Sequence, residues 1–378
     1  MSSIELTIII FLLLIGGCYG TLIILFTVGW SRLKKHKIID RPNTSISIVV
    51  ALRNEGDTVT KLIDQLIRQD YPEELFEIIL VNDHSTDQTT HLIKNHQAND
   101  KIKLLDLGED SFGKKSAITY GVSHARGKLI VATDADCRYH INWLKTIESY
   151  YRQNNYKMLV GPVCIEYDSS WFAQFQALEF NSLQGSGGGA IGIGMPIMCN
   201  GANLIYEKNA FDKLEGFKGN EHIPGGDDIF LLEKFINAFG GQSIGYIKER
   251  SSIVYTNTSP SLRSYLHQRI RWVAKSPAYR NPFIIFTAIV VFLFNLGLLI
   301  NWISLIFIHS SNFIAFTIGI VLFKTLIDFP LLWKSTGFFR QRSILMYHYY
   351  YLHVLETIFI ACSAILGNLL SYKWKGRK

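Results

Sequence analysis

The sequence has few charged residues and few cysteines, and each shortage argues against certain classes of protein. Only 18% of its residues are charged and 48% are hydrophobic, which is a low charge content for a soluble domain. The five cysteines show no C-x-x-C spacing, and two of them lie in long apolar runs. A disulfide framework or a zinc site is therefore not expected, which suits a reducing compartment.

Long stretches with little or no charge stand where a soluble protein would be polar. Residues 4–30 carry one charged side chain, and residues 283–309 carry none. Each run exceeds the roughly 20 residues that cross a bilayer core of about 30 Å. A third run, 313–333, is interrupted by Lys324 and Asp328, which lie four residues apart and would face one another on a helix. These runs predict membrane-spanning helices.

The fourth apolar run, 343–372, leaves the topology open. It contains Glu356 and two histidines, and polar groups at mid-bilayer depth are costly. Three C-terminal spans would place the basic tail, 373–378, outside and break the positive-inside tendency. Two spans with an interfacial or re-entrant fourth segment would keep that tail inside. We therefore expect a C-terminal membrane region, 283–372, of two or three transmembrane helices.

The N-terminal segment, 1–31, is predicted to be a transmembrane anchor. A cleaved signal peptide fits less well, because the apolar run is long and no basic residue precedes it. Basic residues follow it directly, so the positive-inside rule places the next segment in the cytosol. We expect an integral protein of the cell (inner) membrane with a cytosolic domain over 44–275. Much of the net charge of +7 lies beside the membrane, where it favours anionic lipids, so nucleic acid is not an expected partner.

Residues 44–275 have the pattern of an α/β domain. Apolar, β-branched runs at 45–52, 76–81 and 128–133 predict buried strands, with a helix at 114–124 among those between them. Strands that alternate with helices imply a mostly parallel, Rossmann-like sheet covered on both faces. Such sheets bind ligands beyond the carboxyl ends of their strands, which is where polar clusters stand in this sequence.

The alternation of strands and helices is less regular beyond residue 158. Residues 171–183 predict an amphipathic helix, and the glycine-rich segment 185–194 predicts a loop. Residues 198–206 predict a strand, and 227–239 predict a helix that ends at a pair of glycines.

An acidic pair, Asp134 and Asp136, comes directly after the strand predicted at 128–133. Two carboxylates on one loop are hard oxygen ligands that suit Mg²⁺ or Mn²⁺ together with phosphate oxygens of a substrate. Such a metal would neutralise a diphosphate leaving group. A plain surface turn is the alternative interpretation, and the position at a strand end favours the metal site.

Further polar residues near strand ends are candidates for binding a nucleotide. Asp83 follows the second strand and carries a carboxylate that can accept a hydrogen bond from a nucleobase. Ala51, Arg53 and Glu55, at and just after the end of the first strand, would wall the same pocket. Lys114 opens a helix, where it would pair with the nucleotide or a phosphate. The plainer alternatives here are helix capping and a solvated surface lysine.

Two more clusters follow in the second half of the domain. Asp227 and Asp228 open a predicted helix, where they either cap it or supply a general base for a sugar hydroxyl. Gln268, Arg271 and Trp272 come just before the membrane. The arginine suits bidentate contact with a diphosphate and the tryptophan an acceptor ring, or both residues anchor the chain at the interface.

Taken together in this order, the clusters resemble glycosyltransferase family 2, in its membrane-bound branch of cellulose-, hyaluronan- and poly-N-acetylglucosamine-synthase-like enzymes. The resemblance covers about 44–275 and the flanking membrane segments, and 199–206 is similar to the family's acceptor-side segment. It implies a GT-A type fold and inverting transfer by single displacement. It also implies a role for each matching residue: base contact for Asp83, nucleotide contact for Asp134, metal ligation for Asp136, general base for Asp228, and a cap over diphosphate and acceptor for Gln268, Arg271 and Trp272.

Three positions depart from the family pattern. The family often has an acidic residue where Asn82 stands, a glycine where His84 stands and a glutamate where Asp227 stands. The last departure leaves two aspartates as candidates for the base, and we favour Asp228.

The sequence therefore predicts transfer of a sugar from a nucleotide-diphosphate sugar, with UDP as the family's commonest carrier, to a hydroxyl of a membrane-associated lipid or glycan. A processive polysaccharide synthase is the alternative within this class, although few C-terminal runs are available to build a channel. A non-catalytic, sugar-nucleotide-binding membrane partner is the alternative of another class, and no missing acidic residue favours it. The sugar, the acceptor and the oligomeric state stay open.

Overall fold

The computed structural model describes residues 2–221 and 223–369, and these residues form two compact units. The sheet unit consists of 33–166 and 194–257, and the helical unit contains the remaining described residues. The sheet unit is therefore discontinuous in sequence, whereas the sequence analysis expects one continuous domain over 44–275. The predicted basic tail, 373–378, lies outside the described residues.

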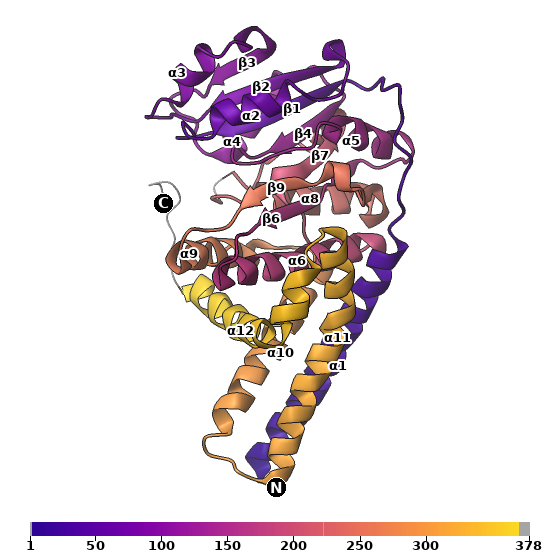
Figure 1. Ribbon diagram of the computed structural model, residues 1–378, viewed down its shortest axis with the longest axis vertical. Coiled ribbons are helices and arrows are strands. Elements are labelled where there is room, and N and C mark those ends of the chain that lie inside the picture. The colour runs from indigo at the N-terminus through magenta and orange to yellow at the C-terminus, as the bar shows by residue number, and fades with distance from the viewer. Residues whose placement is uncertain (1, 222, 370–378) are drawn as a thin grey trace. The chain divides into compact units, whose positions relative to one another are not determined.

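The helical and strand elements are labelled in Figure 1. The strands are β1 (Ile46–Leu52), β2 (Phe76–Asn82), β3 (Ile102–Asp106), β4 (Leu129–Thr133), β5 (Met158–Val160), β6 (Val163–Glu166), β7 (Leu204–Glu207), β8 (Ile244–Tyr246) and β9 (Val254–Asn257). The α-helices are α1 (Ser3–Arg32), α2 (Val59–Leu66), α3 (Thr89–Lys94), α4 (Lys114–Ser123), α5 (Trp143–Arg152), α6 (Trp171–Gly192), α7 (Lys208–Lys213), α8 (Asp227–Phe239), α9 (Leu262–Val273), α10 (Pro282–Ser304), α11 (Ser311–Phe338) and α12 (Arg342–Leu369).

The sheet unit is built on a seven-stranded sheet of order β3-β2-β1-β4-β7-β5-β8. Strands β1 to β4 pair in parallel, β7 runs antiparallel to both of its neighbours, and β5 and β8 are parallel. A separate parallel pair joins β6 and β9. The predicted fold class, an α/β domain with a mostly parallel sheet, is confirmed.

The central strands are buried, which explains why their sequences are continuous apolar runs. Helix α4 packs directly on β1 and β2 at Gly121, where a Cβ would lie 2.6 Å from Val49 Cγ1 and 3.0 Å from Val81 Cγ2. In the sheet, β2 is the neighbour of β1 on one side and β4 is its neighbour on the other side, so the strand order reverses at β1. The carboxyl ends of these three strands therefore form a topological switch point, the usual ligand site of such sheets.

The strand predicted at 198–206 is only partly correct. The observed strand β7 begins at Leu204 and is preceded by a short 3₁₀ turn, Gly201–Asn203. The side chain of Asn200 accepts a hydrogen bond from Ala202 N, and the amide of Asn203 donates to two backbone carbonyls. Asn200 thus satisfies the backbone of the turn locally, and Asn203 ties the turn to two distant segments, so the strand ladder starts later than the apolar pattern predicts.

The loop predicted at 185–194 is wrong for residues 185–192, because these form the C-terminal part of helix α6. Each glycine inside a helix costs about 0.5–1 kcal/mol relative to alanine, but here the missing side chains let α6 touch α1. A Cβ on Gly189 would lie 2.2 Å from Phe26 O, and one on Gly29 would lie 1.9 Å from Gly189 O. Close backbone contact of this kind is typical of membrane helices and outweighs the low helix propensity.

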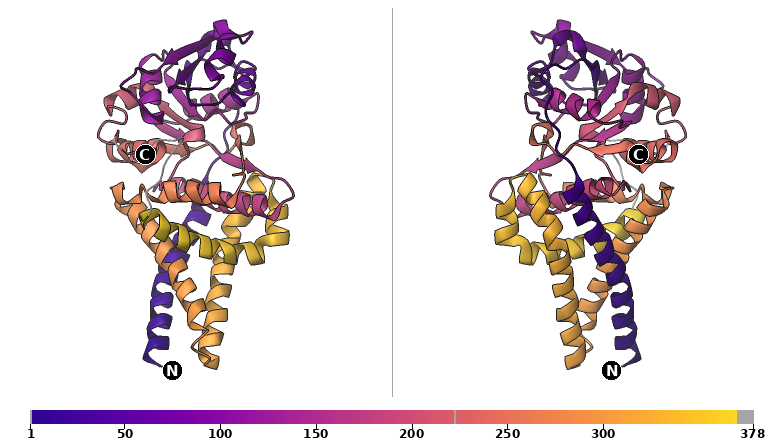
Figure 2. Two further views of the ribbon diagram at one scale, coloured as in Figure 1. Left: turned by 90° about the vertical axis from the view of Figure 1, so that its left-hand side faces the viewer. Right: turned by 90° about the vertical axis from the view of Figure 1, so that its right-hand side faces the viewer.

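Among the described residues, three helices are long and apolar enough to cross a membrane, namely α1, α10 and α11. Helix α1 packs against both α10 and α11, and Figure 2 shows these helices running side by side. Helix α12 passes the same test only if Arg342–Tyr351 and Val354–Gly367, which are bent by 77° relative to each other, are counted together as one span. The choice between two and three C-terminal spans therefore depends on this bent helix.

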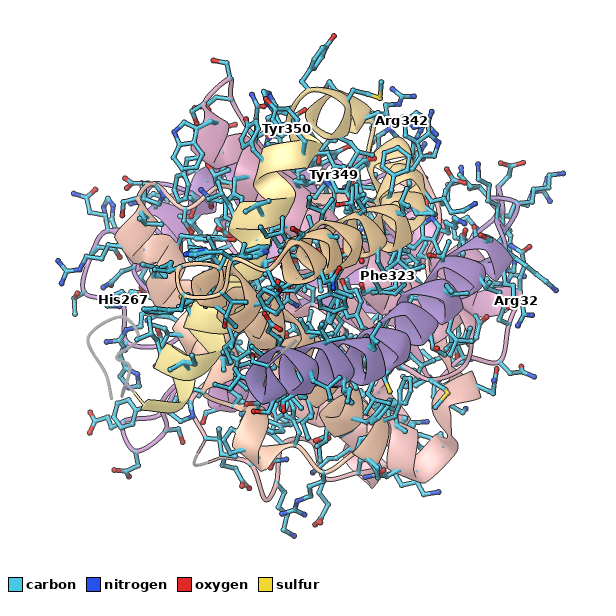
Figure 3. All side chains as sticks on the ribbon, turned by 90° about the horizontal axis from the view of Figure 1, so that it is seen from below. Arg32, His267, Phe323, Arg342, Tyr349 and Tyr350 are labelled. Atoms are coloured by element: carbon cyan, nitrogen blue, oxygen red, sulfur yellow. The ribbon has the colours of Figure 1, made fainter. Side chains whose placement is uncertain are left out.

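The predicted pair of Lys324 and Asp328 on α11 is confirmed. The Lys324 Nζ lies 2.7 Å from Asp328 Oδ2, and the Tyr19 hydroxyl of α1 donates to Asp328 Oδ1 at 2.7 Å. Both charged side chains are buried among helices. Phe323 of the same helix lies against α1 (Figure 3), where a Cβ on Gly20 would come within 2.8 Å of its ring. The ion pair and the tyrosine thus join α11 to the N-terminal helix.

Candidate active site

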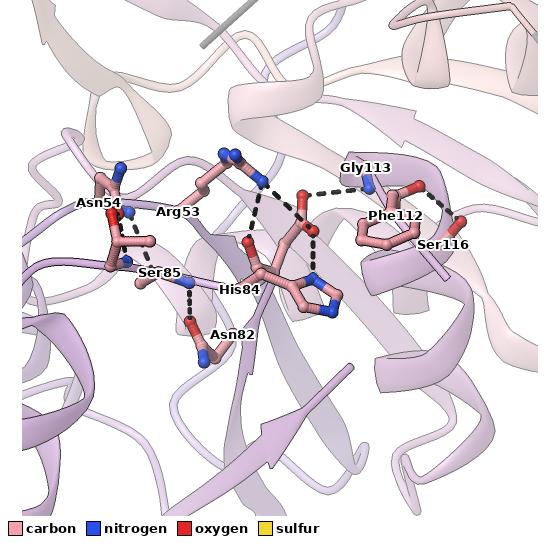
Figure 4. A network of polar contacts seen from close by, with 10 residues as sticks. Arg53, Asn54, Asn82, His84, Ser85, Phe112, Gly113 and Ser116 are labelled. Carbon is pink, nitrogen blue, oxygen red and sulfur yellow. Dashed lines mark hydrogen bonds and ion pairs between the residues drawn. The ribbon is translucent and has the colours of Figure 1, made fainter. Parts of the chain in front are cut away.

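Asp83, in the loop after β2, has contacts with residues of three segments, among them Arg53, His84 and Gly113, which are labelled in Figure 4. The backbone N–H of Gly113, just before α4, donates to Asp83 Oδ2 at 3.1 Å. The Asp83 Oδ1 lies 3.0 Å from His84 Nδ1 and 3.8 Å from Arg53 Nη1, and Arg53 also donates to the Asp83 carbonyl at 3.3 Å. Asp83 is buried, so these contacts fix a carboxylate at the carboxyl ends of β1 and β2.

The loops after β1 and β2 are also bonded to each other. Asn54 N donates to Ser85 Oγ at 3.0 Å, and Asn54 Oδ1 accepts from Thr86 N at 2.8 Å. His84 has a φ of 55°, a conformation in which glycine is free of strain and which histidine tolerates better than most residues. This backbone conformation explains why the resembled family often has glycine at that position. In β1 itself, Ala51 is the residue that is not fully buried, which is consistent with a predicted place on the pocket wall.

Lys114, the first residue of α4, joins the two acidic clusters. Its Nζ lies 2.8 Å from Asp134 Oδ1 and 3.0 Å from Asp227 Oδ2. Burial would lower the pKa of this ammonium, but the two carboxylates outweigh burial and raise the pKa well above its ordinary value. The side chain is therefore charged at neutral pH. The sequence predicts contact of Lys114 with a nucleotide, and in the structure this side chain also holds together the loop after β4 and the start of α8.

The second acid after β4, Asp136, lies in surroundings that favour a cation. Asp136 is exposed as a residue, but partial loss of water around its carboxyl group and the negative charges of Asp134 and Glu55 raise its pKa. The Thr256 hydroxyl lies 3.5 Å from its Oδ2. A divalent cation would relieve this repulsion, and carboxylate oxygens are the ligands that Mg²⁺ and Mn²⁺ prefer. The donor set of Asp134 and Asp136 therefore fits the predicted metal.

The protein would supply only part of that metal's coordination shell. Within 2–221 and 223–369, no group of three or more histidine, cysteine, aspartate and glutamate side chains is arranged to hold an ion. Ions such as Mg²⁺ commonly bind through one or two carboxylates and complete their shell with substrate phosphates and water. The site therefore fits a metal that arrives with, or is completed by, a phosphate-bearing ligand.

Asp227 and Asp228 open α8 as predicted, but their surroundings differ. Asp227 is buried and bound to Lys114, whereas Asp228 is half-buried and its Oδ1 accepts a hydrogen bond from Ile229 N at 2.8 Å. Gly226 precedes the helix with a φ of 68°, which only glycine adopts without strain. The free N–H groups of the helix start favour both negative charges. Of the two acids, Asp228 is the less buried.

The segment before β7 lies against the same acids. A Cβ on Gly201 would come within 2.9 Å of both Asp227 Oδ2 and Lys114 Nζ, so a larger residue there would displace the ends of both side chains. Burial and the charges of Asp228 and Asp227 raise the pKa of the Cys199 thiol well above its ordinary value, so this cysteine stays a neutral thiol. The run that resembles an acceptor-side segment thus borders the acidic pair.

Sequence reasoning missed Lys115, the neighbour of Lys114. Its buried ammonium donates to the carbonyls of Asn220 at 2.6 Å and Ile223 at 3.0 Å, and lies 4.7 Å from the Phe230 ring centroid. These contacts hold the loop that leads into α8. Backbone carbonyls carry no residue-type signature, so no pattern in the sequence indicates this role.

The remaining predicted residues, Gln268, Arg271 and Trp272, lie on α9 of the helical unit and are half-buried. Helix α9 begins with a capping box in which Ser261 and Ser264 bond each other's backbone. The spacing of three and four residues from Gln268 places all three side chains along one side of the helix. Their grouping with the carboxylates of the sheet unit stays a prediction.

Comparison with known proteins agrees with the fold and with the motifs. Residues 47–214 match the family described as Glycosyl transferase family 2. The chain therefore contains a glycosyltransferase family 2 domain, which confirms the resemblance drawn from the motifs. Together with the mostly parallel sheet, this match defines a domain of the GT-A glycosyltransferase class.

The chain is similar to two curated proteins over part of its length. It is 30% identical over 142 residues to an uncharacterized glycosyltransferase of Synechocystis, which is 37% of this chain and 44% of that protein. It is 30% identical over 141 residues to a poly-beta-1,6-N-acetyl-D-glucosamine synthase of Staphylococcus epidermidis, which is 37% of this chain and 34% of that protein. The match thus spans less than half the length of either relative.

A solved structure shares the fold over almost the whole chain. A mannosyltransferase from Pyrobaculum calidifontis, solved in complex with GDP-Man and Mn²⁺, aligns with a TM-score of 0.61 at 16% identity. The alignment covers 96% of this chain and 99% of the mannosyltransferase chain. At this identity the likeness describes the fold.

Proposed function

We propose that this protein is a membrane-bound glycosyltransferase that moves a sugar from a nucleotide-diphosphate sugar to a hydroxyl of a membrane-associated lipid or glycan. The observation that carries the proposal is the Lys114 ammonium, which lies within 3.0 Å of carboxylates from two distant acidic motifs. These motifs follow β4 and open α8, at the edge of a sheet where α/β folds bind ligands. The family 2 domain matched over 47–214 supports the same activity.

The donor would bind across the carboxyl ends of β1, β2 and β4. Asp83, held by Gly113 N, would accept a hydrogen bond from the nucleobase, with Ala51, Arg53 and Glu55 along the pocket wall. Lys114 would meet the diphosphate, because its charged ammonium is well suited to phosphate oxygens. UDP is the carrier expected from the family, and the GDP-Man complex of the mannosyltransferase makes GDP the second carrier to test.

Asp136 and Asp134 would hold the divalent cation, Mg²⁺ or Mn²⁺, which supplies charge neutralisation to the departing diphosphate. The crowding that raises the pKa of Asp136 supports this assignment, because a cation removes its cause. The Mn²⁺ bound in the similarly folded mannosyltransferase supports it as well. Arg271 and Gln268 would cap the diphosphate, as the resemblance to the family implies.

Asp228 would act as the general base. A sugar hydroxyl has a very high pKa, so its proton must leave as its oxygen attacks the anomeric carbon. Asp227 is buried and bound to Lys114, whereas Asp228 is half-buried, and this difference in burial supports Asp228 over its neighbour. Attack from the face opposite the leaving group inverts the anomeric carbon in a single displacement, and the acceptor ring would rest on Trp272.

The chain is proposed to lie in the cell (inner) membrane with its catalytic domain in the cytosol, where nucleotide sugars are made. The candidate spans α1, α10 and α11 support the membrane placement. The basic cluster after α1 supports the orientation through the positive-inside rule.

A panel of labelled UDP- and GDP-sugars tests the proposal directly. Each donor is offered to membranes that contain the full-length protein, with Mn²⁺ or with EDTA, and nucleoside diphosphate release and labelled product are both measured. We expect one donor class to be consumed, and EDTA to stop the release. A purified, folded protein that releases no nucleoside diphosphate from any donor would favour a non-catalytic sugar-nucleotide-binding role instead.

A processive polysaccharide synthase is a second candidate, favoured by the 30% identity to a poly-beta-1,6-N-acetyl-D-glucosamine synthase. The product separates the two functions. A single transfer yields an acceptor heavier by one or a few sugars in a mass spectrum, whereas a synthase yields a ladder or a polymer.

A further inference from the structure

Arg269 lies on α9 between the proposed functional residues and is buried, while Gln268, Arg271 and Trp272 on either side of it are half-buried. Its guanidinium carbon lies 4.2 Å from the centroid of the Trp272 ring and 4.7 Å from the centroid of the Tyr265 ring. A guanidinium at this distance from an aromatic face is attracted to the ring electrons. Arg269 therefore contacts the ring that is proposed to receive the acceptor.

The positive charge of Arg269 is paired with a carboxylate on another helix. Its Nη2 pairs with the carboxylate of Glu179 on α6, and the same nitrogen lies 3.3 Å from the Tyr265 hydroxyl. Both charged residues are buried, and a buried guanidinium needs such a partner. Among the described residues, Arg269 Nε and Nη1 have no hydrogen-bond partner, so Glu179 and the aromatic rings carry its stabilisation.

Helix α6 holds the start of α9 at a second point. The Gln176 amide donates to Ser259 O at 3.1 Å and accepts from Ser259 N at 2.8 Å. Gln176 and Glu179 lie three residues apart, on one side of α6, so a single helix face fixes both the approach to α9 and its buried arginine. The glycines of α6 in turn seat this helix on α1.

We propose that Arg269 is a positioning residue, which Glu179 holds in place so that its guanidinium fixes the orientation of the Trp272 ring. The inference rests on the proposed function in one respect, namely that Trp272 receives the acceptor. The orientation of the ring itself is independent of any substrate, and can be measured without one.

The test uses full-length protein labelled with 5-fluorotryptophan in detergent micelles and observed by ¹⁹F NMR. The Trp272 resonance is assigned by its loss in Trp272→Phe. We expect Arg269→Met to move this resonance by more than its linewidth, Glu179→Gln to move it in the same direction, and Arg269→Lys to restore it in part. The matched control is Arg263→Met, at an exposed arginine of the same helix, which should leave it in place.

A Trp272 resonance that stays in place in both Arg269→Met and Glu179→Gln would overturn the inference. Glu179→Gln keeps the shape of the pair, so it decides the question if Arg269→Met fails to fold. A transfer assay with a lipid extract as acceptor gives the second readout, in which Arg269→Met should raise the acceptor KM severalfold and leave the donor KM unchanged. If Trp272→Ala leaves the acceptor KM unchanged, the proposed acceptor role of Trp272 fails, and the NMR result still decides the role of Arg269.

Discussion

The Lys114 ammonium lies 2.8 Å from Asp134 Oδ1, and this contact joins the start of α4 to the loop after β4. The same nitrogen reaches Asp227, so one cation separates two carboxylates that would otherwise repel each other. A charged hydrogen bond contributes about 1.5–3 kcal/mol. Lys114→Met should therefore weaken binding of UDP or GDP with Mn²⁺ by about 10- to 100-fold. Isothermal titration calorimetry measures this change.

Lys61→Met is the matched control for that experiment, because Lys61 is exposed on α2. It should bind both nucleotides like the unmodified protein. If Lys114→Met also binds them with unchanged affinity, Lys114 has a structural role only.

The crowded carboxylate of Asp136 leads to a prediction in which stability and function change in opposite directions. Its pKa is raised in the folded protein, so the unfolded chain loses this proton more readily and stability falls as the pH rises through the folded pKa. Asp136→Asn removes this cost at neutral pH. We expect the metal-free variant to melt at a slightly higher temperature, and its melting temperature to gain nothing from Mn²⁺ and nucleotide. A variant that melts lower and still responds to Mn²⁺ would contradict both parts.

The buried pair on α11 should dominate the stability of the helical unit. Asp328→Ala removes the carboxylate that lies 2.7 Å from Lys324 and also accepts from Tyr19, and breaking a buried pair in this way costs about 3–5 kcal/mol. Titration of the micelle-bound protein with a denaturing detergent gives the free energy of unfolding and so measures the loss. The double variant Lys324→Met/Asp328→Leu removes both charges and should recover most of it. Equal losses in the single and double variants would show that the ion pair is not the cause.

The contact of α6 with α1 predicts opposite effects for one substitution at two glycines. Gly189→Ala would bring a Cβ to 2.2 Å from the Phe26 carbonyl, so the helices must separate, at about 1–3 kcal/mol. Gly17→Ala meets nothing within 4 Å and should stabilise α1 by about 0.5–1 kcal/mol. The same detergent unfolding assay compares them. A destabilised Gly17→Ala and a neutral Gly189→Ala would refute the packing described.

Local sequence pattern predicts much of the sheet unit. Strands β1, β2 and β4 are continuous apolar runs because they are buried on both faces, and α8 begins at Asp227 and ends at Phe239 as its acidic start and terminal glycines indicate. The pairing of Lys324 with Asp328 also follows from spacing alone, since residues four apart are neighbours on a helix.

Contacts between distant segments account for what the pattern missed. The glycines before Gly192 form a helix because their lack of side chains lets the backbone of α1 pack closely against them. Nothing within 185–194 indicates that α1 is their neighbour. The double contact of Lys114 and the loop held by Lys115 likewise depend on where α8 returns to the sheet. Helical propensity and the alternation of apolar residues are properties of single segments, so they cannot predict contacts between segments that are distant in sequence.

The general base is the most direct test of the proposed chemistry. Asp228→Asn keeps the shape of the side chain and removes its ability to take a proton, so the full-length variant should bind donor with near-unchanged affinity. Its turnover should fall by about 10²- to 10⁴-fold, measured as sugar transferred per enzyme under saturating donor. Asp227→Asn, which loses a carboxylate bound to Lys114, should instead weaken donor binding. Transfer by Asp228→Asn at close to the rate of the unmodified protein would contradict the account.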